Sequence, residues 1–253
     1  MISLRDRIAI ITGASRGIGA ATAIKFAEAG ARGLVINYNR DRDSAALVGA
    51  ECERLGARVM LARADVSRTS SVEKMVGSAV NRFGSLDILV ANAGVWKRAA
   101  IEEMTERQWS ETININLRSI YACCKAAAHV MTAQRRGTII LISSTAGQRG
   151  EAFHSHYAAS KGAIISMTKS LAAELGPRGV TVNCVAPGWV ATDMTSGALA
   201  DPKQKRRIRD LIPIGRVATP EEIAGPILFL ASDLASHVNG EVLNVNGGSV
   251  LCG

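Results

Sequence analysis

The chain has 253 residues, of which 47% are hydrophobic and 21% charged, and this length and composition suffice for one sizeable core. We therefore expect a single domain over residues 1–253. No apolar run approaches the length of a membrane-spanning helix, and charged residues at 5–7 lead directly into an apolar segment. The sequence thus argues against a membrane protein and against a secretory signal.

The formal net charge of +8 admits a nucleic acid, an acidic protein or a polyanionic cofactor as a partner. Much of this charge lies in residues 203–209, which we interpret as the solvated face of a short helix. No aromatic residues are interleaved with these cations, so a nucleic-acid surface is not predicted. The five cysteines lack metal-ligand spacing, which indicates reduced thiols in a cytoplasmic protein and no metal site; they are Cys52, Cys123, Cys124, Cys184 and Cys252.

Strand-like and helix-like segments alternate along the whole chain. Strands are expected at residues 7–12, 33–38, 58–63, 86–90, 138–142, 180–185 and 241–245, and helices near 17–29, 42–55, 69–82, 109–134, 156–176 and 221–231. This alternation predicts an α/β fold, a doubly wound parallel sheet of seven strands with helices on both faces. The irregular stretch at residues 188–215 contains prolines and glycines but no expected strand, and we expect it to form a substrate lid.

A glycine-rich turn joins the first expected strand to the first expected helix. Its spacing, G-x-x-x-G-x-G, differs from the commoner G-x-G-x-x-G. Glycines let the backbone approach a pyrophosphate, and the N-terminus of the following helix attracts the negative charge. A plain tight turn does not account for this composition. The turn therefore predicts a dinucleotide site formed by Gly13, Ser15, Arg16, Gly17, Ile18 and Gly19.

The second expected strand ends without an acidic residue at its tip. A carboxylate at this point would accept hydrogen bonds from the ribose of NAD(H) and would repel the 2′-phosphate of NADP(H). Here the strand runs into Asn39 and Arg40, and Arg40 together with Arg16 would attract that phosphate. Asp41 and Asp43 read as the first turn of the next helix. We expect NADP(H) as the cofactor, held in part by Asn39 and Arg40, with NAD(H) as the alternative.

Tyr157 and Lys161 stand four residues apart on an expected helix, so their side chains share a face. A nearby ammonium favours the phenolate and would lower the pKa of Tyr157 toward the working range, which suits proton exchange with a carbonyl or alcohol oxygen. By itself the spacing favours an amphipathic helix with a surface lysine, and the glycine-rich turn reverses this preference in favour of a catalytic pair. His154 and His156 cannot share a helix face and are expected at a pocket rim or an interface.

Together these segments closely resemble the short-chain dehydrogenase/reductase family, and the resemblance covers essentially the whole chain. It implies a Rossmann fold and a catalytic set of Asn116, Ser144, Tyr157 and Lys161. Ser144, thirteen residues before Tyr157 as is usual in the family, would hold the substrate oxygen. Lys161 would also bind the nicotinamide ribose, and Asn116 would complete a proton relay through water.

The resemblance implies further cofactor contacts where successive strands end, which is where open α/β sheets bind ligands. The acid after the third strand would lie against the adenine, and the threonine after the sixth would contact the nicotinamide carboxamide. These contacts are Asp65, Val66, Asn92, Ala93, Gly94, Pro187, Gly188, Val190 and Thr192, in addition to Tyr157 and Lys161.

Within the family the chain is most similar to the 3-oxoacyl-[acyl-carrier-protein] reductases. This similarity implies NADPH-dependent reduction of a 3-oxoacyl thioester in fatty acid biosynthesis, and a homotetramer packed through the helices near 109–134 and 156–176. It also implies that an acidic carrier protein binds at Arg135 and Arg178, although each arginine alone would equally suit a helix dipole. A sugar or polyol dehydrogenase of the same family is the alternative. A non-catalytic nucleotide-binding interaction protein is disfavoured because all four catalytic residues are present.

Overall fold

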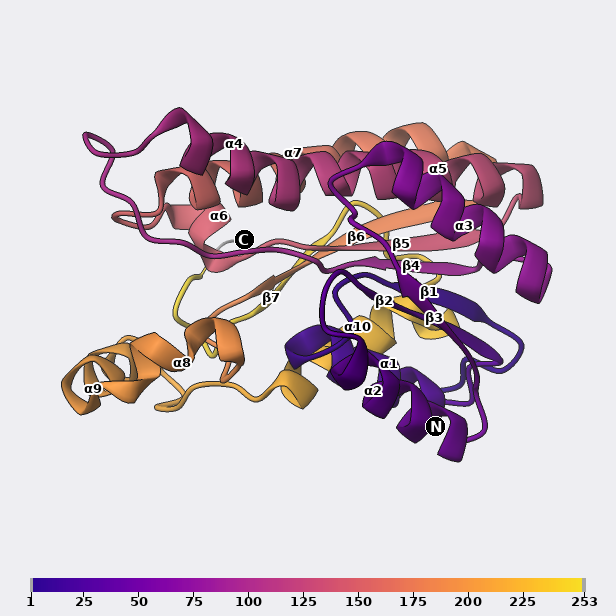
Figure 1. The fold of residues 1–253 in the computed structure, drawn as a ribbon, viewed down its shortest axis with the longest axis horizontal. Helices are drawn as coiled ribbons and strands as arrows, with labels where there is room; N and C mark the ends of the chain where they lie inside the picture. Colours follow the sequence, from indigo (N-terminus) through magenta and orange to yellow (C-terminus); the bar gives the residue numbers. More distant parts are fainter. Residues whose placement is uncertain (1, 252–253) are drawn as a thin grey trace.

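The sheet has seven strands in the order β3-β2-β1-β4-β5-β6-β7, all of them parallel (Figure 1). This computed structural model describes residues 2–251. The strands are β1 (Ile8–Ile11), β2 (Gly33–Tyr38), β3 (Arg58–Arg63), β4 (Ile88–Ala91), β5 (Gly137–Ile142), β6 (Val180–Pro187) and β7 (Val242–Val245). The expected doubly wound α/β fold is confirmed. The strand order reverses between β1 and β4, and a crevice opens at this point beyond the carboxyl ends of the strands.

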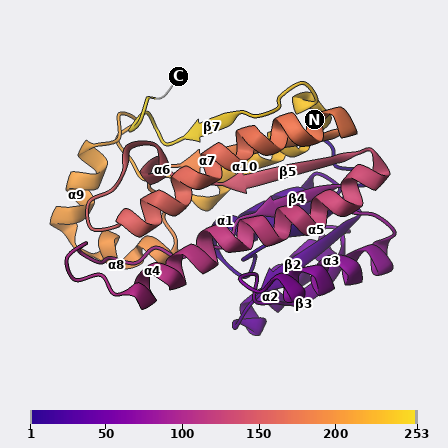
Figure 2. The same ribbon diagram turned by 90° about the horizontal axis from the view of Figure 1, so that it is seen from above.

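Helices cover both faces of the sheet, and each layer has its own hydrophobic cluster. One layer consists of α1 (Gly17–Glu28), α2 (Arg42–Arg54) and α10 (Pro220–Ala231), and the other of α3 (Thr69–Phe83), α5 (Ser119–Gln134) and α7 (Ser155–Leu175). Seen from above, α3, α5 and α7 lie side by side across one face of the sheet (Figure 2). No helix within residues 2–251 is long and apolar enough to cross a membrane.

The helix expected near residues 109–134 is divided into three parts. It begins as α4 (Glu106–Ile113), continues as a π-helical turn (Asn114–Arg118) and resumes as α5. The start lies earlier than expected because Thr105 and Gln108 form a capping box. The wider π-helical turn falls where Asn116 points into the molecule, and such turns are frequent at functional sites.

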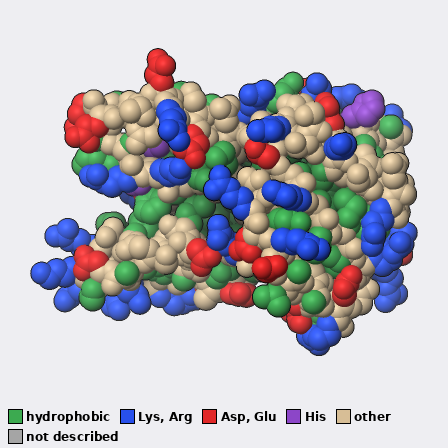
Figure 3. Space-filling model, in the orientation of Figure 1, with side chains coloured by type: hydrophobic (Ala, Val, Ile, Leu, Met, Phe, Trp, Pro, Cys, Tyr) green, Lys and Arg blue, Asp and Glu red, His purple; other side chains and the backbone are tan. Residues whose placement is uncertain are grey.

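The segment 188–215 was expected to be irregular, and that expectation is wrong. It folds into α8 (Asp193–Ala200) and α9 (Pro202–Asp210), which project beyond the carboxyl end of the sheet. Thr192 caps α8 through Thr195, and Asp201 caps α9 with proline at its first position, so both starts carry ordinary helix signals. Residues 203–209 do lie on a short helix, as their charge pattern indicated. Figure 3 shows a cleft lined by hydrophobic side chains between this projection and the lobe above it.

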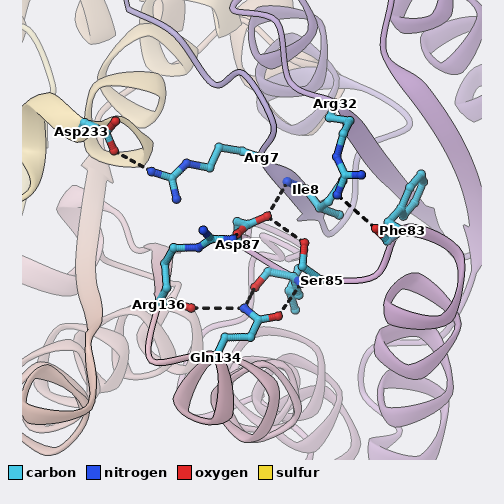
Figure 4. Close-up of polar contacts among 10 residues, drawn as sticks. Arg7, Ile8, Arg32, Phe83, Ser85, Asp87, Gln134, Arg136 and Asp233 are labelled. Carbon is cyan, nitrogen blue, oxygen red and sulfur yellow. Dashed lines mark hydrogen bonds and ion pairs between the residues drawn. The ribbon is translucent and has the colours of Figure 1, made fainter.

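Near the amino ends of the strands, the carboxylate of Asp87 joins three neighbouring segments (Figure 4). Its Oδ2 accepts hydrogen bonds from the Ile8 backbone N–H at 2.9 Å and from the Ser85 hydroxyl at 3.1 Å. Its Oδ1 forms an ion pair with Arg136 at 2.6 Å. The side chain is fully buried. These contacts hold the starts of β1, β4 and β5 together, so this edge of the sheet is structural.

We expect Asp87→Ala to lower the free energy of unfolding by about 2 kcal/mol, because it leaves the Ile8 N–H and the Arg136 guanidinium without their partner. Urea denaturation followed by circular dichroism would measure the change. Glu51→Ala, which removes an exposed ion pair with Arg54, is the control and should leave the midpoint unchanged. Equal midpoints for wild type and Asp87→Ala would show that the Asp87 contacts do not stabilise the sheet.

Candidate active site

The glycine-rich turn has the backbone conformation that its sequence requires. Gly13 and Gly17 have φ angles of +62° and +56°, in the left-handed region that favours glycine. A Cβ on Gly19 would collide with the Gly13 carbonyl and the Asn92 amide. The amide side chain of buried Asn37 supports the turn by accepting from the Gly13 N–H at 3.2 Å and donating to two carbonyls that end β3.

The first turn of α1 is suited to hold an anion. It contains no acidic residue, and among residues 2–251 no side chain caps it. Its free N–H groups therefore face the crevice together with the positive end of the helix dipole. A pyrophosphate fits this cradle, since the missing Cβ atoms leave room for it against the backbone.

One elongated cleft runs along this edge of the sheet, from the glycine-rich turn past the ends of β2 and β3. Nearly all the residues expected to contact the cofactor line it: Gly13, Ser15, Arg16, Gly17, Ile18, Asn39, Arg40, Asp65, Val66, Asn92, Ala93, Gly94 and Thr192. Gly19 lies directly beneath. Two of the polar side chains already have structural partners, because Asp65 accepts from the Ser67 N–H and hydroxyl and Asn92 donates to the Thr12 carbonyl at 2.9 Å.

A second cleft adjoins the first and contains the catalytic candidates. Ser144, Tyr157, Lys161, Pro187, Gly188, Val190 and Thr192 all line it. Ser144 is the second residue after β5 and caps α6 (Thr145–Arg149) by accepting from the Ala146 N–H at 3.1 Å. Lys161 is buried, and its ammonium donates to the carbonyl of Ile142, the last residue of β5, at 2.8 Å. Its own carbonyl accepts from the Ser143 hydroxyl at 2.7 Å, so Ser143 is structural.

The proton on Tyr157 is held more firmly than the sequence indicated. Burial raises the pKa of Tyr157 to about 12, a hydrogen bond with Ser144 opposes the rise, and the Glu151 carboxylate adds to it. Burial lowers the pKa of Lys161 to about 8, and its Nζ lies 5.8 Å from the centroid of the Tyr157 ring. The expectation that Lys161 brings the pKa of Tyr157 below its usual value is therefore wrong for the protein by itself. At neutral pH the phenol of Tyr157 therefore keeps its proton.

Asn116 is buried, and both the oxygen and the nitrogen of its side-chain amide form hydrogen bonds within the protein. Its Oδ1 accepts from the Val95 N–H at 2.8 Å, and its Nδ2 donates to the Val95 carbonyl at 2.9 Å and to the Ser160 hydroxyl at 3.3 Å. These bonds tie the π-helical turn both to the loop after β4 and to α7. The side chain therefore fixes the position of the π-helical turn beside the site.

An aromatic wall, formed by Trp96, His154 and Trp189, was not expected from the sequence. The His154 ring stacks on Trp96 with centroids 4.5 Å apart, and Trp189 meets Trp96 edge-on at 5.7 Å. The Trp96 Nε1–H points at both oxygens of Glu151, each 3.2 Å away. Trp96, Trp189 and Glu151 line the catalytic cleft. Because Trp96 and Glu151 come from different loops, no local pattern could reveal their contact.

Three other residues named from the sequence lie away from the clefts. His156 is completely buried and neither ring nitrogen has a hydrogen-bond partner within residues 2–251, so its assignment to a pocket rim or an interface is wrong. Arg135 and Arg178 lie near each other at the amino edge of the sheet, since the backbone of Arg135 packs against Gly179. Six residues of β5 separate this edge from Ser144, which corresponds to about 20 Å.

Comparison with known proteins agrees with this architecture. Residues 13–249 match the family model described as Enoyl-(Acyl carrier protein) reductase. The chain is 39% identical to the 3-oxoacyl-[acyl-carrier-protein] reductase of Synechocystis, over 99% of this chain and 100% of the relative. It is 42% identical to the protein of that name from Chlamydia trachomatis, over 97% and 98% of the two chains.

Two solved structures are closely similar over the whole fold. A dehydrogenase/reductase from Sinorhizobium meliloti superposes with a TM-score of 0.92 at 36% identity, covering 98% of this chain and 97% of the other. A structure described as a candidate gluconate dehydrogenase from Agrobacterium tumefaciens superposes with a TM-score of 0.93 at 31% identity, covering 98% of each chain.

We expect Glu151→Gln to lower the pKa of Tyr157, because a carboxylate disfavours the phenolate and the amide that replaces it has no charge. The variant keeps an oxygen that can accept from Trp96. Spectrophotometric titration of tyrosinate, with the titration of Tyr157→Phe subtracted, would show the shift toward lower pH. Glu53→Gln, on the exposed side of α2, is the control. An unchanged titration in Glu151→Gln would mean that Glu151 does not influence the phenol.

Proposed function

This chain belongs to the short-chain dehydrogenase/reductase family of NAD(P)-dependent oxidoreductases, and we propose that it reduces 3-oxoacyl thioesters on an acyl carrier protein to the 3-hydroxyacyl form. The observation that carries the proposal is the meeting of Ser144 and Tyr157 in a cleft that adjoins the dinucleotide cradle. Two hydroxyl groups at one point suit the oxygen of a ketone. The curated relatives of nearly equal length support a thioester substrate.

The glycine-rich turn and Lys161 would hold NADPH, which when bound would supply the hydride for the carbonyl carbon. The Ser144 hydroxyl donates to the carbonyl oxygen and holds it beside the phenol. As negative charge develops on that oxygen, Tyr157 transfers its phenolic proton to it; the O–H bond of the tyrosine breaks and that of the alcohol forms. Lys161 stabilises the resulting phenolate, and a relay through water in which Asn116 takes part returns a proton from solvent.

The proposed cofactor is NADP(H) rather than NAD(H). Arg16 and Arg40 both line the end of the cleft where β2 stops, and both are exposed. Asp41, which follows Arg40, accepts from the Ser44 N–H at 3.0 Å as the cap of α2. Arg16 forms only a long, exposed ion pair with Asp193, at 3.6 Å. A 2′-phosphate would compete with this carboxylate for Arg16 and would also bind Arg40.

Proposed partners and assembly follow the family. A cytoplasmic homotetramer would bury the groove between α3, α5 and α7, where Tyr121 is half exposed and Met167 and Leu171 contribute apolar surface. Arg135 and Arg178 border this groove region, about 20 Å from the cleft of their own chain. As contacts for a carrier protein they would therefore serve the site of a neighbouring subunit.

A sugar or polyol dehydrogenase is the second candidate. Glu151 and Arg149 line the catalytic cleft, and paired charged groups of this kind suit a substrate with several hydroxyls. The likeness to the candidate gluconate dehydrogenase points the same way. A non-catalytic nucleotide-binding role is disfavoured, since Ser144, Tyr157 and Lys161 line one cleft and buried Asn116 is hydrogen-bonded to Ser160 of the same helix, α7.

Initial rates of NADPH oxidation with acetoacetyl-[acyl carrier protein] test the proposal. We expect turnover with NADPH that exceeds turnover with NADH, and a loss of about a thousandfold in kcat for Tyr157→Phe, which keeps the ring but removes the proton donor. NADPH binding by this variant, measured by fluorescence, is the control for folding. Turnover of polyols or sugar ketones, with none of the thioester, would favour the second candidate.

A further inference from the structure

Helix α9 carries a concentration of positive charge that the proposed reaction does not use. Five of its nine residues are cationic: Lys203, Lys205, Arg206, Arg207 and Arg209. All five are exposed. Within residues 2–251 the only ion pair formed by any of them is a long one, 4.0 Å, between Arg206 and Asp210. The remaining four cations are available to an external partner.

These cations are arranged around a fixed support. Ile208 is the buried residue of α9, and Ile212 is buried just beyond the helix end. Lys203, Arg206 and Arg207 follow an i, i+3, i+4 spacing, so they share one face, which points away from Ile208. The charges therefore stand on an anchored helix about 13 Å long rather than on a loose loop.

Helix α9 also stands at the entrance to the catalytic cleft. It follows α8 directly, and Met194 and Thr195 of α8 line that cleft opposite Ser144 and Tyr157. Figure 3 shows Lys and Arg side chains gathered at the tip of the lower projection, beside the opening of the cleft. A partner held on α9 would thus present a substrate directly to the proton donor of the same chain.

The surface beside these cations is apolar. Leu211 and Ile214 follow α9 and are 61% and 66% exposed. An anionic small molecule or a nucleotide would use the charges but not two exposed aliphatic side chains. A protein surface that combines carboxylates with apolar residues matches both features, since protein interfaces surround an apolar centre with polar groups.

We propose that α9 with Leu211 and Ile214 is the docking surface for the acidic carrier protein that bears the acyl thioester, which rests on the function proposed above. The cations attract the carrier and orient it, and the aliphatic pair contacts its apolar surface. Arg135 and Arg178 lie at the opposite edge of the sheet. A carrier protein bound at α9 would therefore deliver its acyl group to the cleft of the same chain.

The test compares two variants that lose the same amount of positive charge. Lys203→Glu/Arg207→Glu reverses one face of α9, and Arg5→Glu/Lys74→Glu reverses two exposed cations that line neither cleft. Binding of holo acyl carrier protein is measured by calorimetry at low and moderate salt. We expect the α9 variant to raise Kd about tenfold, with a weaker salt dependence, and the control to bind as the wild type does.

Reduction of acetoacetyl pantetheine, which has no carrier, tests the catalytic proposal separately and should be unaffected by either variant. Carrier binding that is unchanged in the α9 variant, or lost only in Arg135→Glu/Arg178→Glu, would overturn the docking surface. If the α9 variant raised KM for acetoacetyl-CoA as much as it raised Kd for the carrier protein, the ligand of α9 would be the phosphates of a nucleotide. That result would overturn the protein partner. Carrier binding that depends on α9 without reduction of any thioester would support the surface and refute the proposed reaction.

Discussion

The attachment of α7 to the end of β5 through Lys161 is the contact on which the catalytic cleft depends. The Lys161 ammonium donates to the Ile142 carbonyl, and its backbone carbonyl accepts from Ser143. The short helix α6 also packs closely against α7, since a Cβ on Gly147 would lie 2.5 Å from the Lys161 carbonyl carbon. Since Tyr157 stands one turn earlier on α7, this attachment fixes its phenol beside Ser144. A single buried lysine therefore fixes α7 against the end of β5.

The amino edge of the sheet contributes to stability, whereas the carboxyl edge forms the candidate active site. At the amino edge, Asp87 satisfies its charge with Arg136, Ile8 and Ser85, and nothing is left for a ligand. At the carboxyl edge the first N–H groups of α1 have no side-chain cap and Tyr157 retains its proton. Unpartnered groups in a crevice are costly in a protein alone, and a bound cofactor and substrate would satisfy them.

Local patterns made much of this architecture predictable. The glycine-rich turn and the Tyr157–Lys161 spacing each lie within a few residues, and the alternation of strands and helices gave the layers and the strand number. The aromatic wall was missed because Trp96 and Glu151 are 55 residues apart in sequence and meet only in the folded chain. The direction of the Tyr157 pKa was missed for a related reason, since burial raises this pKa more than the hydrogen bond with Ser144 lowers it, and burial cannot be read from spacing.

The central claim is that a cofactor bound at this edge of the sheet transfers a hydride to a ketone. Transfer of an isotopic label from the cofactor tests this claim most directly. Acetoacetyl pantetheine would be incubated with NADPH carrying deuterium at C4 of the nicotinamide, and the product examined by mass spectrometry and NMR. The account predicts deuterium on C3 of a 3-hydroxyacyl product, with the hydroxyl proton derived from solvent. Tight binding of NADPH without any deuterium at C3 would contradict it.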